Sequence, residues 1–250
     1  MRIVHIITRL VLGGAQENTL ITCRLLAQRG HEVTLITGPA LGPEGGLFNW
    51  TKDAGYEVIV LDSMRRAILP GKDVLTYLQL KSLLRKLQPD IIHTHSAKAG
   101  ILGRWSGHAL KGQFESGSQK PYVVHTIHGL AFHDYQSRLL NRAYIVAEKS
   151  AAKCTDAFIT VADVMTEKSR AAGIGVDKPY TTAYSAIDEE AFLQKPADDD
   201  IKAFRRKYGI SDQAVVTITV ARLAELKGHE YIIESAKRLA ARCKDCCWLF

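Results

Sequence analysis

Two basic residues follow an apolar run near the C-terminal end of the sequence. The run covers residues 215–220, Arg222 and Lys227 come next, and a helical pattern then begins. Arginine offers a rigid fork of donors, and lysine offers a mobile point charge. The first backbone amides of a helix have no partner within it, so they favour anions. These residues predict a diphosphate site, and therefore a nucleotide-linked donor.

A loop with paired glycines follows the first apolar run. Gly13 and Gly14 precede a helical pattern, so the backbone could approach a ligand closely and the helix amides could hold a phosphate. The loop has neither the Gly-x-Gly-x-x-Gly pattern of dinucleotide sites nor the Gly-Lys-Ser/Thr of the P-loop. A flexible strand-to-helix turn without a ligand explains the glycines equally well.

Two pairs of histidines lie at the ends of two other apolar runs. His93 and His125 fall inside these runs, so we expect them to be core imidazoles. His95 and His128 lie at the loop edge, where we expect a pocket. Because His93 and His95 point the same way from a strand, a zinc site is an alternative, although no carboxylate or cysteine accompanies them.

Two further patterns have simple explanations. Residues 198–200 are three aspartates, and their Asp-x-Asp spacing can hold a metal on a diphosphate, but they precede a helical pattern whose N-terminus they would cap. Cys243 and Cys246 could form half of a zinc site, but no second such pair accompanies them. The total of five cysteines is odd, which indicates reduced thiols rather than a disulfide framework.

Short β-rich runs alternate with longer helical patterns over residues 1–185. The predicted strands are 2–7, 31–37, 56–61, 90–93, 121–127, 156–161 and 179–184, and the predicted helices are 15–29, 72–88, 97–110, 136–153 and 162–172. This alternation predicts an α/β domain with a Rossmann-like parallel sheet and helices on both faces. Ligands of such sheets bind beyond the carboxyl ends of the strands.

A second domain is expected over residues 186–250. Its pattern gives a helix at 201–208, a strand at 214–220, a helix at 227–242 and the opening of another strand at 247–250. One β-α-β start cannot cover both faces of a sheet. We therefore expect this second Rossmann-like domain to be only begun within the chain.

Composition and charge narrow the class of partner. The chain has 250 residues, of which 46% are hydrophobic and 24% charged, as in soluble α/β proteins. Its net charge of +7 favours anionic partners, but the basic residues are not grouped with aromatics, so we expect no nucleic acid. No apolar stretch reaches 18 residues and no signal-peptide layout opens the chain, so we expect a cytoplasmic protein.

One predicted helix is both basic and apolar. The stretch 136–153 carries Arg138, Arg142, Lys149 and Lys153 among leucine, isoleucine, valine and tyrosine. A solvated basic face of an amphipathic helix explains this pattern. The alternative is peripheral contact with an anionic membrane, which would place the protein at the cytoplasmic face.

Five motifs resemble those of family 4 glycosyltransferases in order and spacing. They are Gly13-Gly14-Ala15-Gln16, His93-Thr94-His95, His125-Thr126-Ile127-His128-Gly129, Tyr184-Ser185-Ala186-Ile187-Asp188 and Arg222-Leu223-x-x-x-Lys227-Gly228. The resemblance covers nearly the whole chain. It implies the GT-B fold, in which an N-terminal acceptor domain and a C-terminal donor domain are paired. It also implies retaining transfer of a hexose from a nucleotide diphosphate sugar, without a metal or other cofactor.

The resemblance also implies roles for particular residues. Arg222 and Lys227 would hold the donor diphosphate and stabilise it as the leaving group, with Gly13 and Gly14 binding the same phosphates. His128 would lie beside the transferred sugar, so the implied catalytic set is His128, Arg222 and Lys227. The acceptor side would be lined by His95, Ser96 and Lys98.

Two departures from the family pattern matter. Ala221 stands where the family usually has glycine, and the family's pair of sugar-binding glutamates would fall beyond Phe250. We therefore expect residues 1–250 alone to be inactive. The expected acceptor is a cell-surface polysaccharide, a lipopolysaccharide or a glycolipid. The alternative is a non-catalytic sugar- or lipid-binding remnant without its donor domain.

Overall fold

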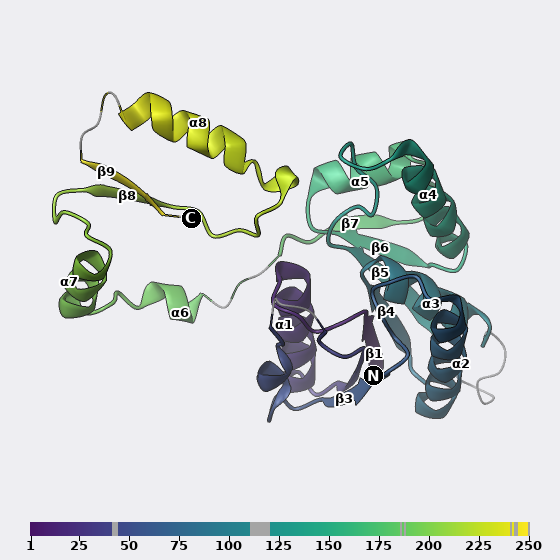
Figure 1. Cartoon of the computed structure of the whole chain (residues 1–250). Coiled ribbons are helices and arrows are strands. Elements are labelled where there is room, and N and C mark those ends of the chain that lie inside the picture. Colours follow the sequence, from purple (N-terminus) through teal and green to yellow (C-terminus); the bar gives the residue numbers. More distant parts are fainter. Residues whose placement is uncertain are drawn as a thin grey trace. The chain divides into compact units, whose positions relative to one another are not determined.

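The structure, a computed structural model, contains two compact units. It describes residues 1–41, 45–110, 121–185, 187, 189–240, 242 and 245–249. The first unit is Met1–Ile187 and the second is Asp188–Phe250 (Figure 1). The boundary expected after residue 185 lies two residues before this division.

The first unit is built on a parallel seven-stranded sheet. Its strands are β1 (Arg2–Ile7), β2 (Glu32–Thr37), β3 (Glu57–Val60), β4 (Ile91–His95), β5 (Tyr122–Ile127), β6 (Ala157–Thr160) and β7 (Tyr180–Thr182). Their order is β3-β2-β1-β4-β5-β6-β7, and every neighbouring pair is parallel. All seven predicted strands are present, and the predicted Rossmann-like sheet is confirmed.

Helices alternate with these strands as the sequence predicted. They are α1 (Gly14–Gln28), α2 (Pro70–Leu87), α3 (Ala97–His108), α4 (Arg138–Ala152) and α5 (Asp163–Ala171), and the short 3-10 helix η1 (Phe48–Thr51) was not predicted. Local chemistry sets their starts. Pro70 needs no amide partner at the first position of α2, and the Ser137 hydroxyl accepts the Leu140 amide at the start of α4.

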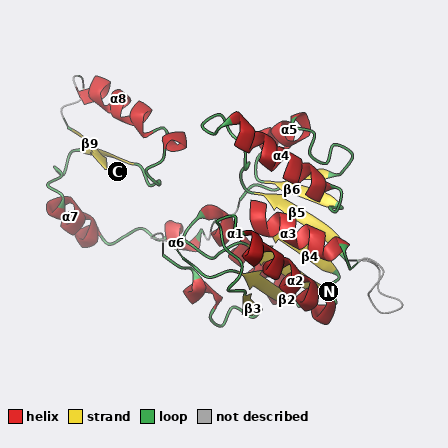
Figure 2. Cartoon of the chain, turned by 45° about the vertical axis from the view of Figure 1, so that its right-hand side comes forward, coloured by secondary structure: helices red, strands yellow, loops and turns green. Residues whose placement is uncertain are grey.

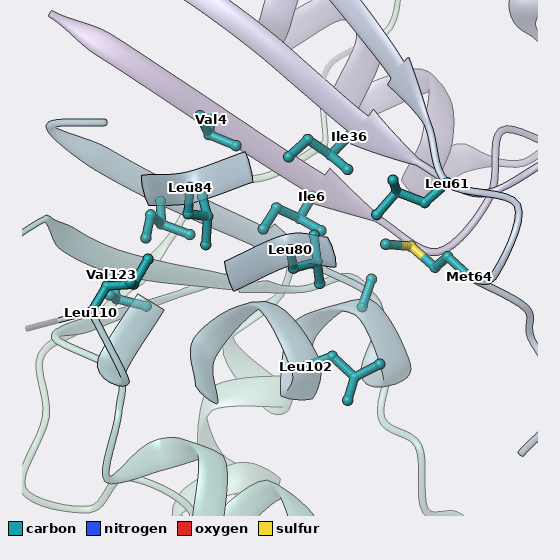
Figure 3. Close-up of a cluster of buried hydrophobic side chains, with 12 residues drawn as sticks. Val4, Ile6, Ile36, Leu61, Met64, Leu80, Leu84, Leu102, Leu110 and Val123 are labelled. Atoms are coloured by element: carbon teal, nitrogen blue, oxygen red, sulfur yellow. The ribbon is translucent and has the colours of Figure 1, made fainter. Parts of the chain in front are cut away.

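The side chains of β1 alternate between two cores, one on each face of the sheet. Val4 and Ile6 pack in a cluster with Leu80 of α2 and Leu102 of α3 (Figure 3). Ile7 belongs to a second cluster, which includes residues of α1 and β2. Successive side chains of a strand point to opposite faces of the sheet. Because both faces of β1 are covered, nearly all of its side chains are buried, and its sequence is therefore an apolar run.

Helix α3 packs closely against the sheet through glycines on its inner side. A Cβ at Gly100, Gly103 and Gly107 would lie 2.5 Å from His125 Cε1, 2.9 Å from Thr94 Cγ2 and 2.7 Å from Ile92 Cδ1, respectively. Such distances are too short for a side chain without movement of the neighbours. The absence of these Cβ atoms lets α3 lie over β4 and β5 (Figure 2).

The second unit is smaller and more open. It contains α6 (Glu190–Leu193), α7 (Asp198–Lys207), β8 (Val215–Ile218), the 3-10 helix η2 (Glu225–Lys227), α8 (His229–Ala240) and β9 (Cys246–Leu249). Strands β8 and β9 form a parallel pair. The buried hydrophobic side chains described in this unit are Ile210 and Ala214, whereas Val215, Ile218 and Tyr231 are exposed.

The three aspartates of the second unit differ from the expected cap. Helix α7 begins at Asp198, three residues before the predicted start, and its N-cap is Ala197. Residues 198–200 therefore form the first turn, where their charges complement the helix dipole as expected, although none of them is the N-cap residue. Within the described part of the chain, no helix is both long and apolar enough to cross a membrane.

Candidate functional site

Histidine rings from three neighbouring strands, β1, β4 and β5, lie close together in the first unit. In the register of the sheet, His5 of β1 is paired with His93 of β4. His95 ends β4, two residues beyond the predicted end of that strand, because it pairs with Thr126 of β5. His128 follows the end of β5. The ring centroids are 5.3 Å apart for His5 and His95, and 5.2 Å apart for His95 and His128.

Two hydrogen bonds join these rings into what we call the histidine chain, His5–His95–His128. Nδ1 of His5 lies 3.0 Å from Nε2 of His95, and Nδ1 of His95 lies 3.0 Å from Nε2 of His128. Both ring nitrogens of His95 are thus engaged, and only 1% of this residue is exposed. His95 is therefore a buried residue and not a loop-edge residue.

The two histidines expected in the core have partners of their own. Nε2 of His93 is 2.7 Å from the Thr126 hydroxyl, and Nδ1 of His125 is 2.9 Å from the Thr94 hydroxyl. His125 packs against α3, on the face of the sheet opposite His93. The expectation of a satisfied core imidazole is confirmed for His125, which is 3% exposed, whereas His93 has a hydrogen-bond partner but is only partly buried.

Three histidines of this cluster are placed so that they could bind a metal ion. Among the described residues, one group of three potential ligands lies close together: His5, His93 and His95 offer ring nitrogens within 4.8 Å of one another. Nδ1 of His5 and Nε2 of His95 are hydrogen-bonded to each other, so a metal ion bound by these two nitrogens would replace that bond. The other zinc alternative included Cys243, which lies outside the described residues.

All five histidines of the cluster favour the neutral form. Burial lowers the pKa of His5 and of His128 to about 4. The pKa values of His93, His95 and His125 are well below the ordinary value. The main cause is burial, and the second is the nearby imidazole and guanidinium groups. At neutral pH these rings therefore act as hydrogen-bonding groups without charge.

Ser96 occupies a strained position between β4 and α3. Its φ is 59°, which is uncommon for a residue other than glycine. Its hydroxyl lies 2.7 Å from the Thr8 hydroxyl, which also accepts the Ala99 amide. These bonds hold the strained backbone in place, and such strain is typical of functional sites.

Lys98 is held near the start of α3. Its Nζ donates to Asp73 Oδ1 at 2.6 Å and to the Ala67 carbonyl. The ammonium group therefore already has two oxygen partners. The predicted acceptor roles of His95, Ser96 and Lys98 stay predictions, and an acceptor would have to compete with these contacts.

The paired glycines lie at the N-terminus of α1. This helix starts at Gly14, whose backbone is exposed, and a Cβ on Gly14 would meet no atom within 4 Å. A Cβ on Gly13 would come within 2.9 Å of the Gln16 side chain. Packing therefore does not require glycine at position 14, although the predicted binding of phosphate by this loop is untested.

Arg222 and Lys227 belong to the second unit, and both are exposed. Lys227 ends η2, Gly228 follows with a φ of 69°, and α8 starts at His229. The Gly228 carbonyl accepts the Tyr231 and Ile232 amides, so Gly228 precedes the first turn of α8. The His229 ring is hydrogen-bonded to the Arg222 carbonyl at 2.8 Å, which ties the two ends of this segment together.

Comparison with known proteins agrees with these features. Residues 13–181 match the glycosyl transferase 4-like domain. The chain belongs to this family. The matched part includes the Gly13–Gly14 loop and most of the histidine chain, while Arg222 and Lys227 lie outside it.

Curated relatives of this glycosyltransferase family member act on sugars. The chain is 29% identical over 243 residues to the UDP-Gal:alpha-D-GlcNAc-diphosphoundecaprenol alpha-1,3-galactosyltransferase of Escherichia coli, covering 95% of this chain and 57% of that protein. It is 33% identical over 103 residues to the alpha-D-kanosaminyltransferase of Streptomyces kanamyceticus, covering 40% of this chain and 25% of that protein. The chain thus spans a little over half of the Escherichia coli relative.

Solved structures with low sequence identity share the fold. A glycosyltransferase from Rickettsia africae ESF-5 superposes with a TM-score of 0.66 at 16% identity, covering 95% of this chain and 57% of that one. Sucrose-phosphate synthase from Thermosynechococcus elongatus gives a TM-score of 0.66 at 16% identity, covering 96% of this chain and 60% of that one. The α/β, GT-B type fold that the sequence predicted is confirmed.

Proposed function

We propose that this chain acts in retaining transfer of a hexose from a nucleotide diphosphate sugar to the acceptor from which a cell-surface polysaccharide, lipopolysaccharide or glycolipid is built. The observation that carries the proposal is the 29% identity across 95% of the chain to a galactosyltransferase. The name of that relative gives a UDP-linked donor and a lipid diphosphate acceptor. Both are anionic, as the net charge of +7 favours.

Arg222 and Lys227 would bind the donor diphosphate in this reaction. Both side chains are exposed, so they can contact a ligand without losing packing contacts in a hydrophobic core. Negative charge grows on the diphosphate as the sugar leaves, and a positioned guanidinium and ammonium group would stabilise that charge. In the first unit, the amide of Gly14 at the N-terminus of α1 is the proposed ligand for a donor phosphate. No metal ion is needed for this arrangement of charges.

His128 would lie beside the transferred sugar. It follows the carboxyl end of β5, where ligands of parallel sheets bind. The ring is neutral at pH 7 because burial lowers its pKa to about 4. It would therefore contribute a hydrogen bond and a fixed position rather than a charge, and correct positioning is a large part of catalysis.

The acceptor would be presented at a membrane surface next to α4. Leu139 and Val146 of this helix are 80% and 66% exposed, and Arg138 and Arg142 are exposed beside them. An exposed face with both apolar and basic side chains suits an anionic lipid surface. On this basis we propose a peripheral location at the cytoplasmic face of the membrane.

Assays of sugar transfer test the proposal. The polypeptide made from the native gene is incubated with UDP-galactose, UDP-glucose, UDP-N-acetylglucosamine or GDP-mannose and a lipid diphosphate sugar acceptor, with and without EDTA. We expect transfer from one donor, resistance to EDTA, and an NMR spectrum of the product that shows the anomeric configuration of the donor. Inverted configuration would contradict the retaining mechanism. Binding of the donor without any transfer would favour the non-catalytic alternative.

A further inference from the structure

The histidine chain leaves one nitrogen without a partner at each end. Nε2 of His5 and Nδ1 of His128 are buried, and neither has a hydrogen-bond partner among the described residues. His95 lies between them and uses both of its nitrogens. A native protein rarely leaves buried polar atoms unpaired, so the two ends call for an explanation.

Charge and valence restrict how protons are arranged along this chain. A neutral imidazole carries one N–H donor and one lone pair. Because each hydrogen bond needs one donor and one acceptor, only two arrangements satisfy both bonds. Either every ring carries its proton on Nδ1, and the donors run from His5 toward His128, or every ring carries it on Nε2 and the donors run the other way. The depressed pKa values keep all three rings neutral, as both arrangements require.

The position of the two ends favours the first arrangement. With protons on Nδ1, the unpaired donor is on His128, at the carboxyl edge of the sheet. With protons on Nε2, the unpaired donor is on His5, which is 0% exposed inside the sheet. An orphaned buried N–H group is rarer in proteins than an orphaned acceptor. Both end nitrogens are buried, but His5 is 0% exposed whereas His128 is partly exposed, so a partner for an N–H group can approach the His128 end with less movement. The His128 end should therefore hold the proton, and the His5 end should hold the lone pair.

We propose that His5 and His95 are positioning residues that hold His128 as its Nδ1–H tautomer, ready to donate to an oxygen of the bound sugar. The lone pair on Nε2 of His128 is occupied by the His95 donor. The ring of His128 is then a hydrogen-bond donor and not a base. The contact with sugar rests on the proposed function, whereas the tautomers do not.

The tautomers are measured directly by long-range proton–nitrogen NMR on the polypeptide with nitrogen-15 histidine at pH 7. We expect His5, His95 and His128 all to carry the proton on Nδ1. A proton on Nε2 of His128, or exchange between its two tautomers, would overturn the proposal. So would a spectrum of these rings that changes when EDTA is added, because rings bound to a metal cannot make these hydrogen bonds.

Substitution of His5 separates positioning from direct contact. His5→Leu removes the first donor, so His128 should exchange between tautomers and kcat should fall roughly tenfold, with little change in the KM of the donor sugar. His5→Asn keeps an amide donor near the position of Nδ1. It should restore a single tautomer of His128 and most of kcat. If His5→Asn and His5→Leu are equally impaired in both measurements, the proposal fails.

His93→Leu is the matched control. His93 is paired in register with His5 and lies in the same cluster, but its hydrogen bond goes to Thr126. This variant should lose stability as His5→Leu does while the tautomer of His128 and kcat stay unchanged. Equal effects of both variants on kcat and tautomer would mean that packing alone is responsible. If the wild-type polypeptide transfers no sugar but shows the expected tautomers, the proposed function fails and the arrangement of the histidine chain stands.

Discussion

The first unit buries His5 and His95 of the histidine chain in its parallel sheet, whereas the second unit carries its candidates on an exposed segment. His95 is 1% exposed and has partners on both ring nitrogens. Arg222 and Lys227 are exposed, and the segment that carries them directly follows β8, which pairs with β9 and has little buried surface. Two different ways of preparing a site are thus found in one chain.

This difference follows from the charge of the groups. A neutral imidazole has weak long-range interactions, so only burial and hydrogen bonds can fix its orientation and tautomer. A guanidinium or ammonium group loses much of its hydration free energy on burial, and it attracts a diphosphate over a distance. The buried imidazoles therefore make the stability of their site depend on pH. The exposed cations form a site that is only weakly ordered before the ligand binds.

The buried ion pair of the first unit should give the largest stability effect. Arg104 Nη2 lies 2.6 Å from Glu148 Oε2, and the Arg104 side chain is 0% exposed. Glu148→Gln leaves the guanidinium buried without a counter-charge, so the free energy of unfolding should fall by about 3–5 kcal/mol in denaturant titrations. Glu234→Gln removes the exposed partner of Arg238 in the second unit and should cost less than about 1 kcal/mol. Similar losses in both variants would contradict the contrast between the units.

Acid should weaken the first unit selectively. The unfolded pKa of His5 is near 6.5 and the folded pKa is about 4, so between these values the unfolded chain binds more protons than the folded one. The stability contributed by neutral His5 is therefore complete above pH 6.5 and is lost as the pH falls toward 4. The pKa shift of His5 alone corresponds to about 3 kcal/mol of folding free energy. The other histidines of the cluster, whose pKa values are also lowered, change the stability in the same direction. Thermal unfolding measured from pH 7 to pH 4 checks this, and a stability that does not change over this range would contradict it.

The close approach of α3 to the sheet should make Gly100 sensitive to a single methyl group. Gly100→Ala places a Cβ 2.5 Å from the His125 ring, so the sheet or the helix must shift, at a cost of about 1–3 kcal/mol. Gly71→Ala in α2 meets no atom within 4 Å and should be neutral or slightly stabilising. Denaturant titrations of both variants test the prediction. A neutral Gly100→Ala would show that α3 is not packed as tightly as described.

The exposed basic face of α4 should give the smallest effect per residue. Each basic side chain near an anionic surface contributes about 1 kcal/mol. Arg138→Glu with Arg142→Glu should therefore reduce co-flotation with phosphatidylglycerol vesicles several-fold. Lys207→Glu with Lys237→Glu changes the net charge equally in the second unit and should leave flotation unchanged. Equal losses in both double variants would mean that net charge, and not α4, drives binding.

The sequence predicted the elements of the fold better than the contacts between them. The seven strands follow from local apolar runs, and β4 was misjudged only at its end, where His95 pairs with Thr126. The expected helix at 227–242 starts at His229 because Glu225–Lys227 form a 3-10 turn. The short helices η1 and α6 have too few residues to show a hydrophobic period.

The candidate site was only partly predictable for the same reason. His95 and His128 were singled out because each lies near the end of an apolar run. His5 was missed because it lies in the middle of β1. Its role depends on the register of β1 with β4, which brings it next to His93 and His95, 88 and 90 residues later in the sequence. A histidine within a predicted central strand, next to a strand that carries other histidines, is the signal that could have identified it.

The most direct test of the central claim is the rate of sugar transfer by the native-gene polypeptide and by its Arg222→Ala and Lys237→Ala variants, with melting temperatures measured in parallel. Our account predicts transfer from a nucleotide diphosphate sugar by the wild type. It predicts a loss of at least about tenfold in kcat/KM for Arg222→Ala without a change in melting temperature, and no loss for Lys237→Ala. Absence of transfer with every donor, or equal rates for all three proteins, would contradict it.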